Sequence, residues 1–545
     1  TLPDATARKQ FASSVTIADL APAEAATLLA PPPDALTTRR TWPVETTTRT
    51  ADAQTLSLWR PLLDKVDALR NAHFKIVRGR FADAEESRWV ADLRFDAVAR
   101  LAGGGVAALE GKLELSMRRD GPAGRDATWR IDGFVTRSFN VQPSAGFLFS
   151  EVLERALPDI ATLKQARTSR QEELIVAKMR DPKTPMPSKY FQYQSLNQHP
   201  GIAVADVDRD GWDDLYVMDR WGTNLLLRNR GDGTFEEIAA KVGLDVTDHT
   251  SSALFADFDN DGDLDVFLGR TLAPSLYFVN EGGKFVERSK TLVASPLPAL
   301  VSSVSAADYD NDGLLDVYLS TYAIDPELQQ DFLDGPAKSA IARRWREGGH
   351  LFKDRPGPPN VLLRNLGGGK FGSAPGGEAL AVYRNTFQST WSDFDGDGDL
   401  DVYLANDFAP NNLLRNDGGR FTDVTDATGT ADLGFGMGAS WGDYDNDGRQ
   451  DLYVTNMYST AGRRITAELN DAGLASMARG NSLLRNQPTT FARVSGLEPP
   501  ALMVERAGWG WGSQFVDVDN DGWLDIHALS GYYTSPPRPG SQPDL

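Results

Sequence analysis

The sequence of 545 residues contains no cysteine, which excludes disulfide bonds, thiolate nucleophiles and cysteine-ligated zinc sites. Histidine is rare: the five histidines lie far apart, and no pair has the spacing of a metal site or a catalytic triad. No apolar run is long enough to cross a bilayer. No basic stripe favours nucleic acid as a partner. With these groups excluded, the acidic side chains are the main candidates for functional residues.

The acidity of the chain is concentrated in one motif. This is a nine-residue loop with aspartate at positions 1, 3, 5 and 9 and glycine at position 6. It occurs six times, beginning at Asp206, Asp257, Asp308, Asp393, Asp443 and Asp517. The six loops hold 24 of the 76 acidic residues, and the other 52 are balanced by 56 basic residues. The formal net charge of −20 therefore reflects the loops and does not indicate a basic partner.

Oxygen ligands at this spacing, with a glycine that permits a sharp turn, are what Ca²⁺ requires. A solvated turn is the alternative interpretation, but a turn alone does not demand four fixed carboxylates in six copies. The loops are not EF-hands, because the ninth residue runs directly into a strand pattern. Position 7 varies among Trp, Asp, Leu and Arg, which indicates a backbone carbonyl ligand. The predicted ligands of about six calcium ions are Asp206, Asp208, Asp210, Trp212, Asp214, Asp257, Asp259, Asp261, Asp263, Asp265, Asp308, Asp310, Asp312, Leu314, Asp316, Asp393, Asp395, Asp397, Asp399, Asp401, Asp443, Asp445, Asp447, Arg449, Asp451, Asp517, Asp519, Asp521, Trp523 and Asp525.

The loops belong to a longer repeat. Their first aspartates are separated by 51, 51, 85, 50 and 74 residues, which is a period near 50 with two insertions. Within each period a second pattern recurs, such as Asn412-Leu-Leu-Arg-Asn416 followed by Gly418, Gly419 and Phe421. Apolar runs separated by Asn/Gly turns predict a β-hairpin. Each period then supplies four strands, and four-stranded units repeated radially form a β-propeller.

These loops and hairpins, with the segment from Gly436 to Asp443, resemble the FG-GAP/VCBS-repeat calcium-binding propellers. The chain is similar to the bacterial branch that is like cartilage acidic protein, and more distantly to the integrin α-subunit head. The resemblance covers roughly residues 190–532. It implies calcium loops that stiffen the blades, and adhesion or ligand binding more often than catalysis. Integrin-type propellers have seven blades, whereas the period here predicts six, with seven as the alternative.

The N-terminal third has another character. We expect a loosely ordered Ala/Thr/Pro-rich segment at residues 1–50 and a small α+β domain at 51–145. Within that domain, apolar periodicity predicts a helix at residues 56–70, and four strand-like stretches follow. A helical connector at 146–185 leads to the propeller at 186–533. A Pro-rich tail, 534–545, ends the sequence.

Both insertions, residues 322–359 and 458–480, fall between the second and third strands of a repeat, on the face opposite the calcium loops. The first carries Arg343, Trp345 and Arg346 on a predicted helix, and the second carries Arg463 and Arg464. Arginine and aromatic side chains are common anchors for partners. They favour recognition of a protein or an anionic glycan, or self-assembly. The alternative is that the insertions pack on the rest of the chain.

The sequence predicts a calcium-stabilised, non-enzymatic binding, adhesion or assembly module. The alternative is a polysaccharide-active enzyme, a lyase or hydrolase, on a propeller scaffold. Extracellular calcium modules work at the millimolar calcium found outside cells. The sequence therefore predicts a location outside the cell, at the cell surface or in a periplasm.

No secretory signal pattern begins at Thr1, so we expect a chain that is either cytosolic or already processed. No Asn-x-Ser/Thr acceptor occurs, and this favours a bacterial source.

Overall fold

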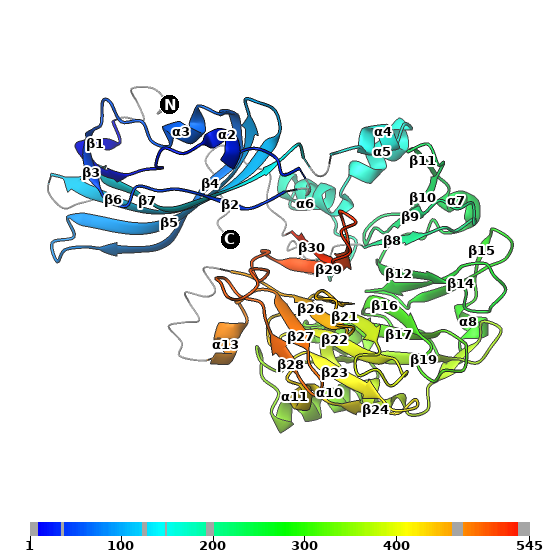
Figure 1. Cartoon of the computed structure of the whole chain (residues 1–545). Coiled ribbons are helices and arrows are strands. Elements are labelled where there is room, and N and C mark those ends of the chain that lie inside the picture. Colours follow the sequence, from blue (N-terminus) through cyan, green and yellow to red (C-terminus); the bar gives the residue numbers. More distant parts are fainter. Residues whose placement is uncertain are drawn as a thin grey trace. The chain divides into compact units, whose positions relative to one another are not determined.

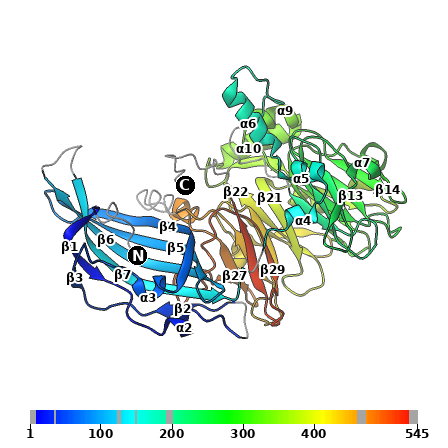
Figure 2. The ribbon, with the colours of Figure 1, turned by 90° about the horizontal axis from the view of Figure 1, so that it is seen from above.

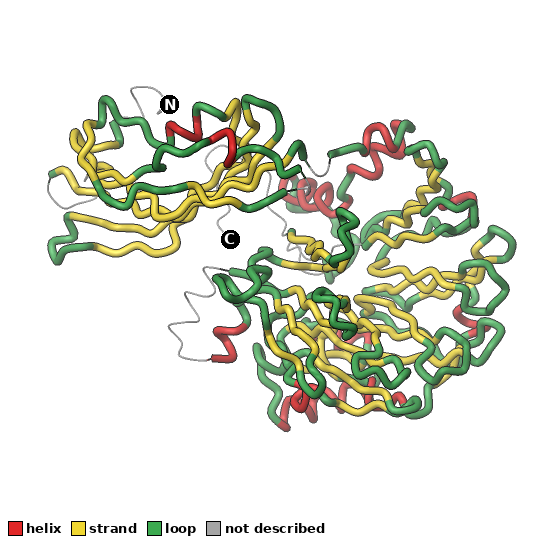
Figure 3. The backbone as a smooth tube through the Cα atoms, viewed as in Figure 1, coloured by secondary structure: helices red, strands yellow, loops and turns green. Residues whose placement is uncertain are grey.

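The computed structural model describes residues 9–33, 37–121, 128–147, 150–191, 201–459 and 472–531. The chain divides into two compact units, Thr1–Glu151 and Val152–Leu545. The chain is mainly β, and Figures 1 to 3 show that strands dominate each unit. No helix among the described residues has the length and apolar character needed to cross a bilayer.

The N-terminal unit is built on one seven-stranded sheet with the order β3-β1-β7-β6-β5-β4, and β2 also pairs with β7. Its strands are β1 (Phe11–Ala18), β2 (Arg40–Trp42), β3 (Arg49–Asp52), β4 (Val66–Phe81), β5 (Arg88–Leu101), β6 (Val106–Asp120) and β7 (Thr128–Ser144), with short helices α2 (Ala25–Leu28) and α3 (Arg60–Leu63). Large aromatic rings meet in the core: the ring centroid of Trp59 lies 4.7 Å from that of Phe95 and 5.1 Å from that of Phe139. Such aromatic pairs add to the stability gained from burial alone.

Two expectations for this unit differ from the structure. The segment at 1–50, expected to be loosely ordered, contains regular structure in its described part: β1 pairs with both β3 and β7 and buries Val15 and Ile17. The long helix expected at 56–70 is limited to α3, since β4 begins at Val66 and pairs with β5. Leu69, which would lie on the apolar face of that helix, is 39% exposed. Pairing between distant strands outweighs local helical periodicity here.

The helical connector contains α4 (Leu153–Ala156), α5 (Ile160–Arg167) and α6 (Arg170–Arg180). Asp159 and Ser169 cap the last two helices by accepting backbone N–H groups. Leu157 packs with Leu225 and Leu227 of the first repeat sheet. This connector therefore belongs to the C-terminal unit.

The C-terminal unit consists of six antiparallel sheets in sequence order, called here the first to the sixth sheet. The first sheet contains β8 (Ile202–Ala205), β9 (Asp214–Val217), β10 (Leu225–Asn229) and β11 (Phe235–Glu237), and the second contains β12 (Thr250–Ala256), β13 (Asp265–Arg270), β14 (Leu276–Asn280) and β15 (Phe285–Glu287). The third sheet contains β16 (Val301–Ala307), β17 (Asp316–Thr321), β19 (Val361–Asn365) and β20 (Phe371–Ser373), and the fourth contains β18 (Pro356–Pro359), β21 (Tyr383–Ser392), β22 (Asp401–Asp407), β23 (Asn412–Asn416) and β24 (Phe421–Asp423). The fifth sheet contains β25 (Gly438–Gly442), β26 (Asp451–Thr455), β27 (Ser482–Asn486) and β28 (Phe491–Arg493), and the sixth, within the described residues, contains β29 (Gly510–Val516) and β30 (Asp525–Ser530). Short helices follow several fourth strands: α7 (Ala239–Val242), α8 (Ser289–Leu292), the 3₁₀ helix η2 (Gly377–Leu380) and α11 (Thr425–Thr428). The prediction of four-stranded units is confirmed for the first five sheets, the fourth of which gains β18 as an extra strand.

Adjacent sheets pack through their first strands. β8 lies beside β12, β12 beside β16, β16 beside β21, β21 beside β25, and β25 beside β29. Figure 1 shows β8, β12 and β16 following one another. In the second to fifth sheets the second strands are the most deeply buried, as in Val266, Phe267 and Leu268, each 0% exposed. Apolar layers between neighbouring sheets therefore hold the unit together.

The two insertions fall where the repeat predicts. The first, after β17, contains α9 (Pro326–Phe332), α10 (Gly335–Glu347) and β18, which pairs with β21. Ile341 is buried, whereas Trp345 is 39% exposed on the same helix. The second, after β26, contains α13 (Ala472–Ser476); Arg463 and Arg464 lie outside the described residues. The first insertion thus packs on the sheets and also presents part of its surface to solvent.

Candidate metal centre

The six Asp-rich loops share one backbone conformation. In each, the two carboxylate oxygens of position 1 accept the N–H groups of positions 5 and 6, at 2.8–3.1 Å. The glycine at position 6 has φ between 85° and 95° in every loop. A side chain at this φ is strained, which explains the constant glycine. The loop is therefore preshaped by its own hydrogen bonds.

The aspartate at position 9 fixes the loop to its sheet. In the first five loops it is at most 1% exposed. One oxygen accepts the N–H of position 2 at 3.0–3.3 Å, and the other accepts the N–H of the asparagine that ends the third strand at 2.7–2.9 Å. Position 9 thus joins the loop to the second and third strands. In the sixth loop Asp525 is exposed, and its Oδ2 accepts the N–H of Val518 at 3.3 Å.

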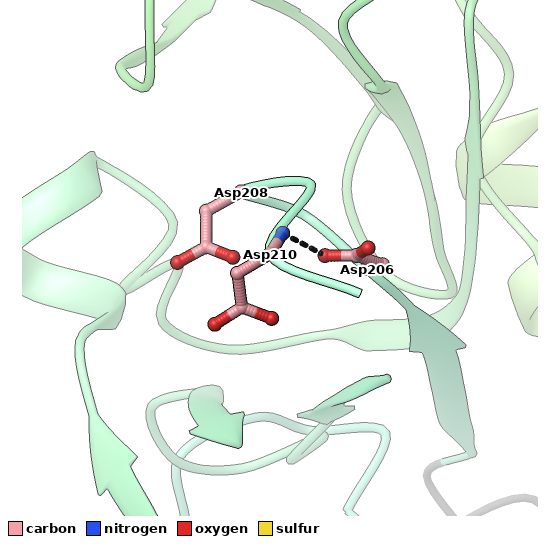
Figure 4. A group of neighbouring side chains, drawn as sticks. All are labelled: Asp206, Asp208 and Asp210. Carbon is pink, nitrogen blue, oxygen red and sulfur yellow. Dashed lines mark hydrogen bonds between the residues drawn. The ribbon is translucent and has the colours of Figure 1, made fainter. Parts of the chain in front are cut away.

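Carboxylate oxygens converge in these loops. In the second to fifth loops positions 1, 3 and 9 each place one oxygen so that all three lie within 4.8 Å of one another: Asp257, Asp259 and Asp265; Asp308, Asp310 and Asp316; Asp393, Asp395 and Asp401; and Asp443, Asp445 and Asp451. In the first loop the corresponding group is Asp206, Asp208 and Asp210, shown in Figure 4 with the hydrogen bond from the Asp210 N–H to Asp206. These groups could hold a metal ion. The structure thus brings together part of the predicted ligand set in each of the first five loops.

The electrostatics of the clusters favour a cation. Burial, opposed by two backbone hydrogen bonds and reinforced by the neighbouring aspartates, raises the pKa of Asp265, Asp316 and Asp401 to about 7. The same causes raise the pKa of Asp451 to about 6. Such shifts measure how unfavourable a group of carboxylates is without positive charge. A bound divalent ion supplies that charge.

Two carboxylate oxygens in the clusters are free to act as metal ligands. Oδ1 of Asp310 and Oδ1 of Asp445 are buried and have no hydrogen-bond partner among the described residues. A buried polar atom without a partner costs free energy. Both belong to position 3 of their loops, which the sequence predicts to be a ligand. Oxygen-only ligands are also what hard cations such as Ca²⁺ prefer.

An arginine that the sequence analysis did not assign also faces the loops. Arg364, in the third strand of its sheet, lies 2.7 Å from Asp310 and 3.0 Å from Asp312. Arg485 has the same relation to Asp445 and Asp447, at 2.7 and 3.2 Å. The sequence does indicate this arginine, because it recurs at a fixed position of the Leu-Leu-Arg-Asn pattern. The arginine offsets part of the loop charge.

Position 7 has varied contacts. Asp399 accepts hydrogen bonds from Asn311 of the preceding loop and from the Gly418 N–H. Arg449 forms an ion pair with Asp447 of its own loop. The side chain at this position therefore has roles of its own in some loops, while its predicted ligand atom remains the backbone carbonyl.

Neighbouring loops are tied to one another by side chains. Arg209, at position 4 of the first loop, lies 2.6 Å from Asp263 and donates to the carbonyl of Gly262 in the second. Asn446 donates to the carbonyl of Gly522 in the sixth loop at 3.1 Å. Sequence periodicity alone gives no sign of this coupling between loops.

Comparisons with known proteins agree with this geometry. The model of the FG-GAP-like repeat matches residues 206–268 and 393–454. Cartilage acidic protein 1 of Xenopus tropicalis is 30% identical over 209 residues, which are 38% of this chain and 28% of that protein. The human protein of the same name is 28% identical over 209 residues, with the same shares. The matched region thus spans less than a third of the length of these relatives.

Among solved structures, BBS1N in complex with ARL6DN, soaked with mercury, is 9% identical and covers 61% of this chain and 93% of that chain, with a TM-score of 0.28. A score this low supports no conclusion. The sequence matches and the loop geometry are independent of it. The chain therefore carries FG-GAP-like repeats and, over the matched part, is similar to cartilage acidic protein 1.

Proposed function

We propose that the C-terminal unit is a calcium-stabilised β-propeller of six blades that serves as a non-enzymatic binding module outside the cell. The observation that carries the proposal is the repeated cluster of carboxylates within 4.8 Å, whose buried members have raised pKa values. The ligands of each ion are positions 1, 3, 5 and 9 and the carbonyl of position 7. Calcium, when bound, supplies positive charge that holds each loop to its sheet. The chain's own residues preshape the loop and orient the carboxylates.

A location outside the cell follows from the ion. Extracellular calcium modules have dissociation constants of about 10⁻⁴ to 10⁻³ M, which cytosolic calcium does not reach. Similarity to cartilage acidic protein 1 supports a binding role for the repeats. The ligand is a protein, a glycan or a second copy of the chain.

The cavity bounded by the first strands supports binding over hydrolysis. It has a volume of about 900 Å³, and none of its described lining residues is an aspartate or a glutamate. A typical glycoside hydrolase needs two carboxyl groups across the scissile bond. Tyr322, which also lines the cavity, donates its hydroxyl to Asp407 at 2.6 Å and is thereby already engaged.

Counting bound ions tests the proposal. Isothermal titration of calcium-depleted protein is expected to show about six calcium ions per chain, with magnesium binding much more weakly because it demands a smaller octahedral site. The variant Asp310→Asn/Asp445→Asn is expected to lose two of them. Full stoichiometry in this variant, or no calcium binding in the wild type, contradicts the ligand assignment. Cleavage of an acidic polysaccharide by the purified protein contradicts the non-enzymatic role.

A further inference from the structure

One end of the cavity lies away from the Asp loops. The residues at that end can be identified by their position in the repeat. In each sheet the first strand runs toward the Asp loop and the second runs away from it. The residue six positions after the ninth aspartate ends or follows the second strand, and thus lies at the end opposite the loop. In the six sheets this residue is Arg220, Thr271, Tyr322, Asp407, Met457 and Gly531. Arg220, Thr271 and Tyr322 line the cavity.

Arg220 is a cation with no partner among the described residues. Its Nε is buried and forms no hydrogen bond there. The adjacent carboxylate, Asp219, accepts the Trp221 N–H at 2.8 Å instead. Arg228, in β10, also has a buried Nε without a hydrogen bond, but its Nη2 forms an ion pair with Glu236, which Lys241 of α7 contacts as well. Arg220 forms no such ion pair with a described residue.

Arg220 is half-buried, and a charge that is partly withdrawn from water without a partner is costly. Burial lowers the pKa of the Arg220 guanidinium to about 9, so it remains protonated at neutral pH. The remaining lining offers no carboxylate within the part of the chain that the structure describes. No described carboxylate of the chain takes this place, and an anionic ligand is the partner that fits.

The rest of the cavity suits a polyhydroxylated molecule. Hydroxyl groups line it from three sheets, and those of Ser251 and Ser302 donate to the backbone carbonyls of Val301 and Thr386. Ser303 Oγ, by contrast, is buried without a partner in the described residues. Trp391 adds an aromatic ring. Its volume of about 900 Å³ lies within the range of small-molecule sites. Hydroxyls beside aromatic rings match the polar edges and apolar faces of a sugar ring.

We propose that this cavity binds an acidic saccharide, with its carboxylate paired to Arg220 and one of its hydroxyl groups bonded to Ser303. The proposal rests on the proposed function, since it gives the binding module a ligand class. It is independent of the calcium assignment, because Arg220 follows the second strand and the Asp loop precedes it.

Ligand-observed NMR titration of the calcium-loaded full chain tests the proposal. The probes are D-glucuronate, D-glucose and inorganic sulfate. Glucuronate is expected to bind at least tenfold more tightly than glucose or sulfate. The variant Arg220→Gln is expected to weaken glucuronate binding by at least about tenfold, because it removes one member of a buried charge pair. Arg230→Gln, an exposed arginine in the turn between β10 and β11, is the matched control and is expected to bind as the wild type does.

Other outcomes overturn the proposal. If Arg220→Gln still binds glucuronate, the binding site is not in the cavity. If the triple variant Arg343→Ala/Trp345→Ala/Arg346→Ala loses glucuronate binding, the site lies on α10 instead. Equal affinity for sulfate and glucuronate rejects the saccharide, and no binding of any probe rejects the site. Thermal melts keep these results interpretable: Arg220→Gln should melt no lower than the wild type, since it removes an unpaired buried charge. A much lower melting temperature shows that Arg220 has a structural partner and also overturns the proposal. Calcium titration of the same samples separates any of these failures from a failure of the proposed function.

Discussion

Asp401, at position 9 of the fourth loop, is expected to be more important for stability than Asp395 at position 3. Its carboxylate is 0% exposed and accepts the N–H groups of Phe394 and Asn416. Asp401→Ala leaves both donors buried and unpaired, which costs about 1–3 kcal/mol for each in addition to the lost ligand. Asp395→Ala removes a ligand only. Thermal melts at saturating calcium compare the two variants, and equal destabilisation contradicts the structural role of position 9.

The buried aspartates also predict how calcium and pH are linked. Burial raises the pKa of Asp265, Asp316 and Asp401 from 3.8 to about 7 in the calcium-free state. The folded state therefore holds protons that the unfolded state releases, and the contribution of these groups is present at low pH and is lost as pH rises through about 7. Calcium requires the ionised carboxylates and competes with these protons. The rise in melting temperature caused by calcium should grow from about pH 5 to about pH 8; an unchanged rise across this range contradicts the assignment.

Position 7 is predicted to contribute its backbone and not its side chain. Leu314 gives the cleanest test, since Arg449 and Asp399 have ion-pair or hydrogen-bond partners. Leu314→Ala is expected to leave calcium affinity within about twofold of the wild type, because a carbonyl ligand is indifferent to the side chain. A large loss of affinity in isothermal titration shows that the backbone-carbonyl assignment is wrong.

Between elements, the asparagine that ends the third strand joins two neighbouring sheets at the third, fourth and fifth sheets. The Nδ2 of Asn416 donates to the carbonyl of Tyr309, in the preceding loop, at 2.7 Å and to the carbonyl of Leu400 at 3.2 Å. Asn416→Ala is expected to destabilise the unit by about 1–3 kcal/mol, because it leaves buried carbonyls unpaired. It should also weaken calcium binding by the loop that begins at Asp308. Arg415→Ala, one residue away on an exposed side chain, is the control, and an equal effect of both changes contradicts this role.

How much of each element could be predicted depended on whether its stabilising contacts are local. The loops and hairpins repeat with the same residues at the same positions, so their local turn chemistry was visible in the sequence. β1 was not predicted, since Val15 and Ile17 are separated by polar residues and are buried only by pairing with β3 and β7. The helix expected at 56–70 failed for the same reason, because β4 is held by β5. Side-chain bridges between loops, such as Arg209 to Asp263, require the tertiary arrangement.

At the scale of the whole molecule, the cavity could be located only from the structure. Its lining comes from strands as distant in sequence as β8 and β29. Aligning the six repeats does single out Arg220, because the equivalent residues of the other repeats carry no positive charge. The sequence alone does not show that its Nε is buried without a partner.

The central claim is that calcium holds the repeats together, and a thermal melt with and without calcium tests it most directly. A site whose dissociation constant lies ten- to a hundredfold below the calcium concentration contributes about 1.4–2.7 kcal/mol. Across the loops, the sum is comparable to the stability of an ordinary domain. The C-terminal unit is therefore expected to melt on the order of 10 °C higher in calcium than after chelation. A difference of only about 1–2 °C contradicts the claim.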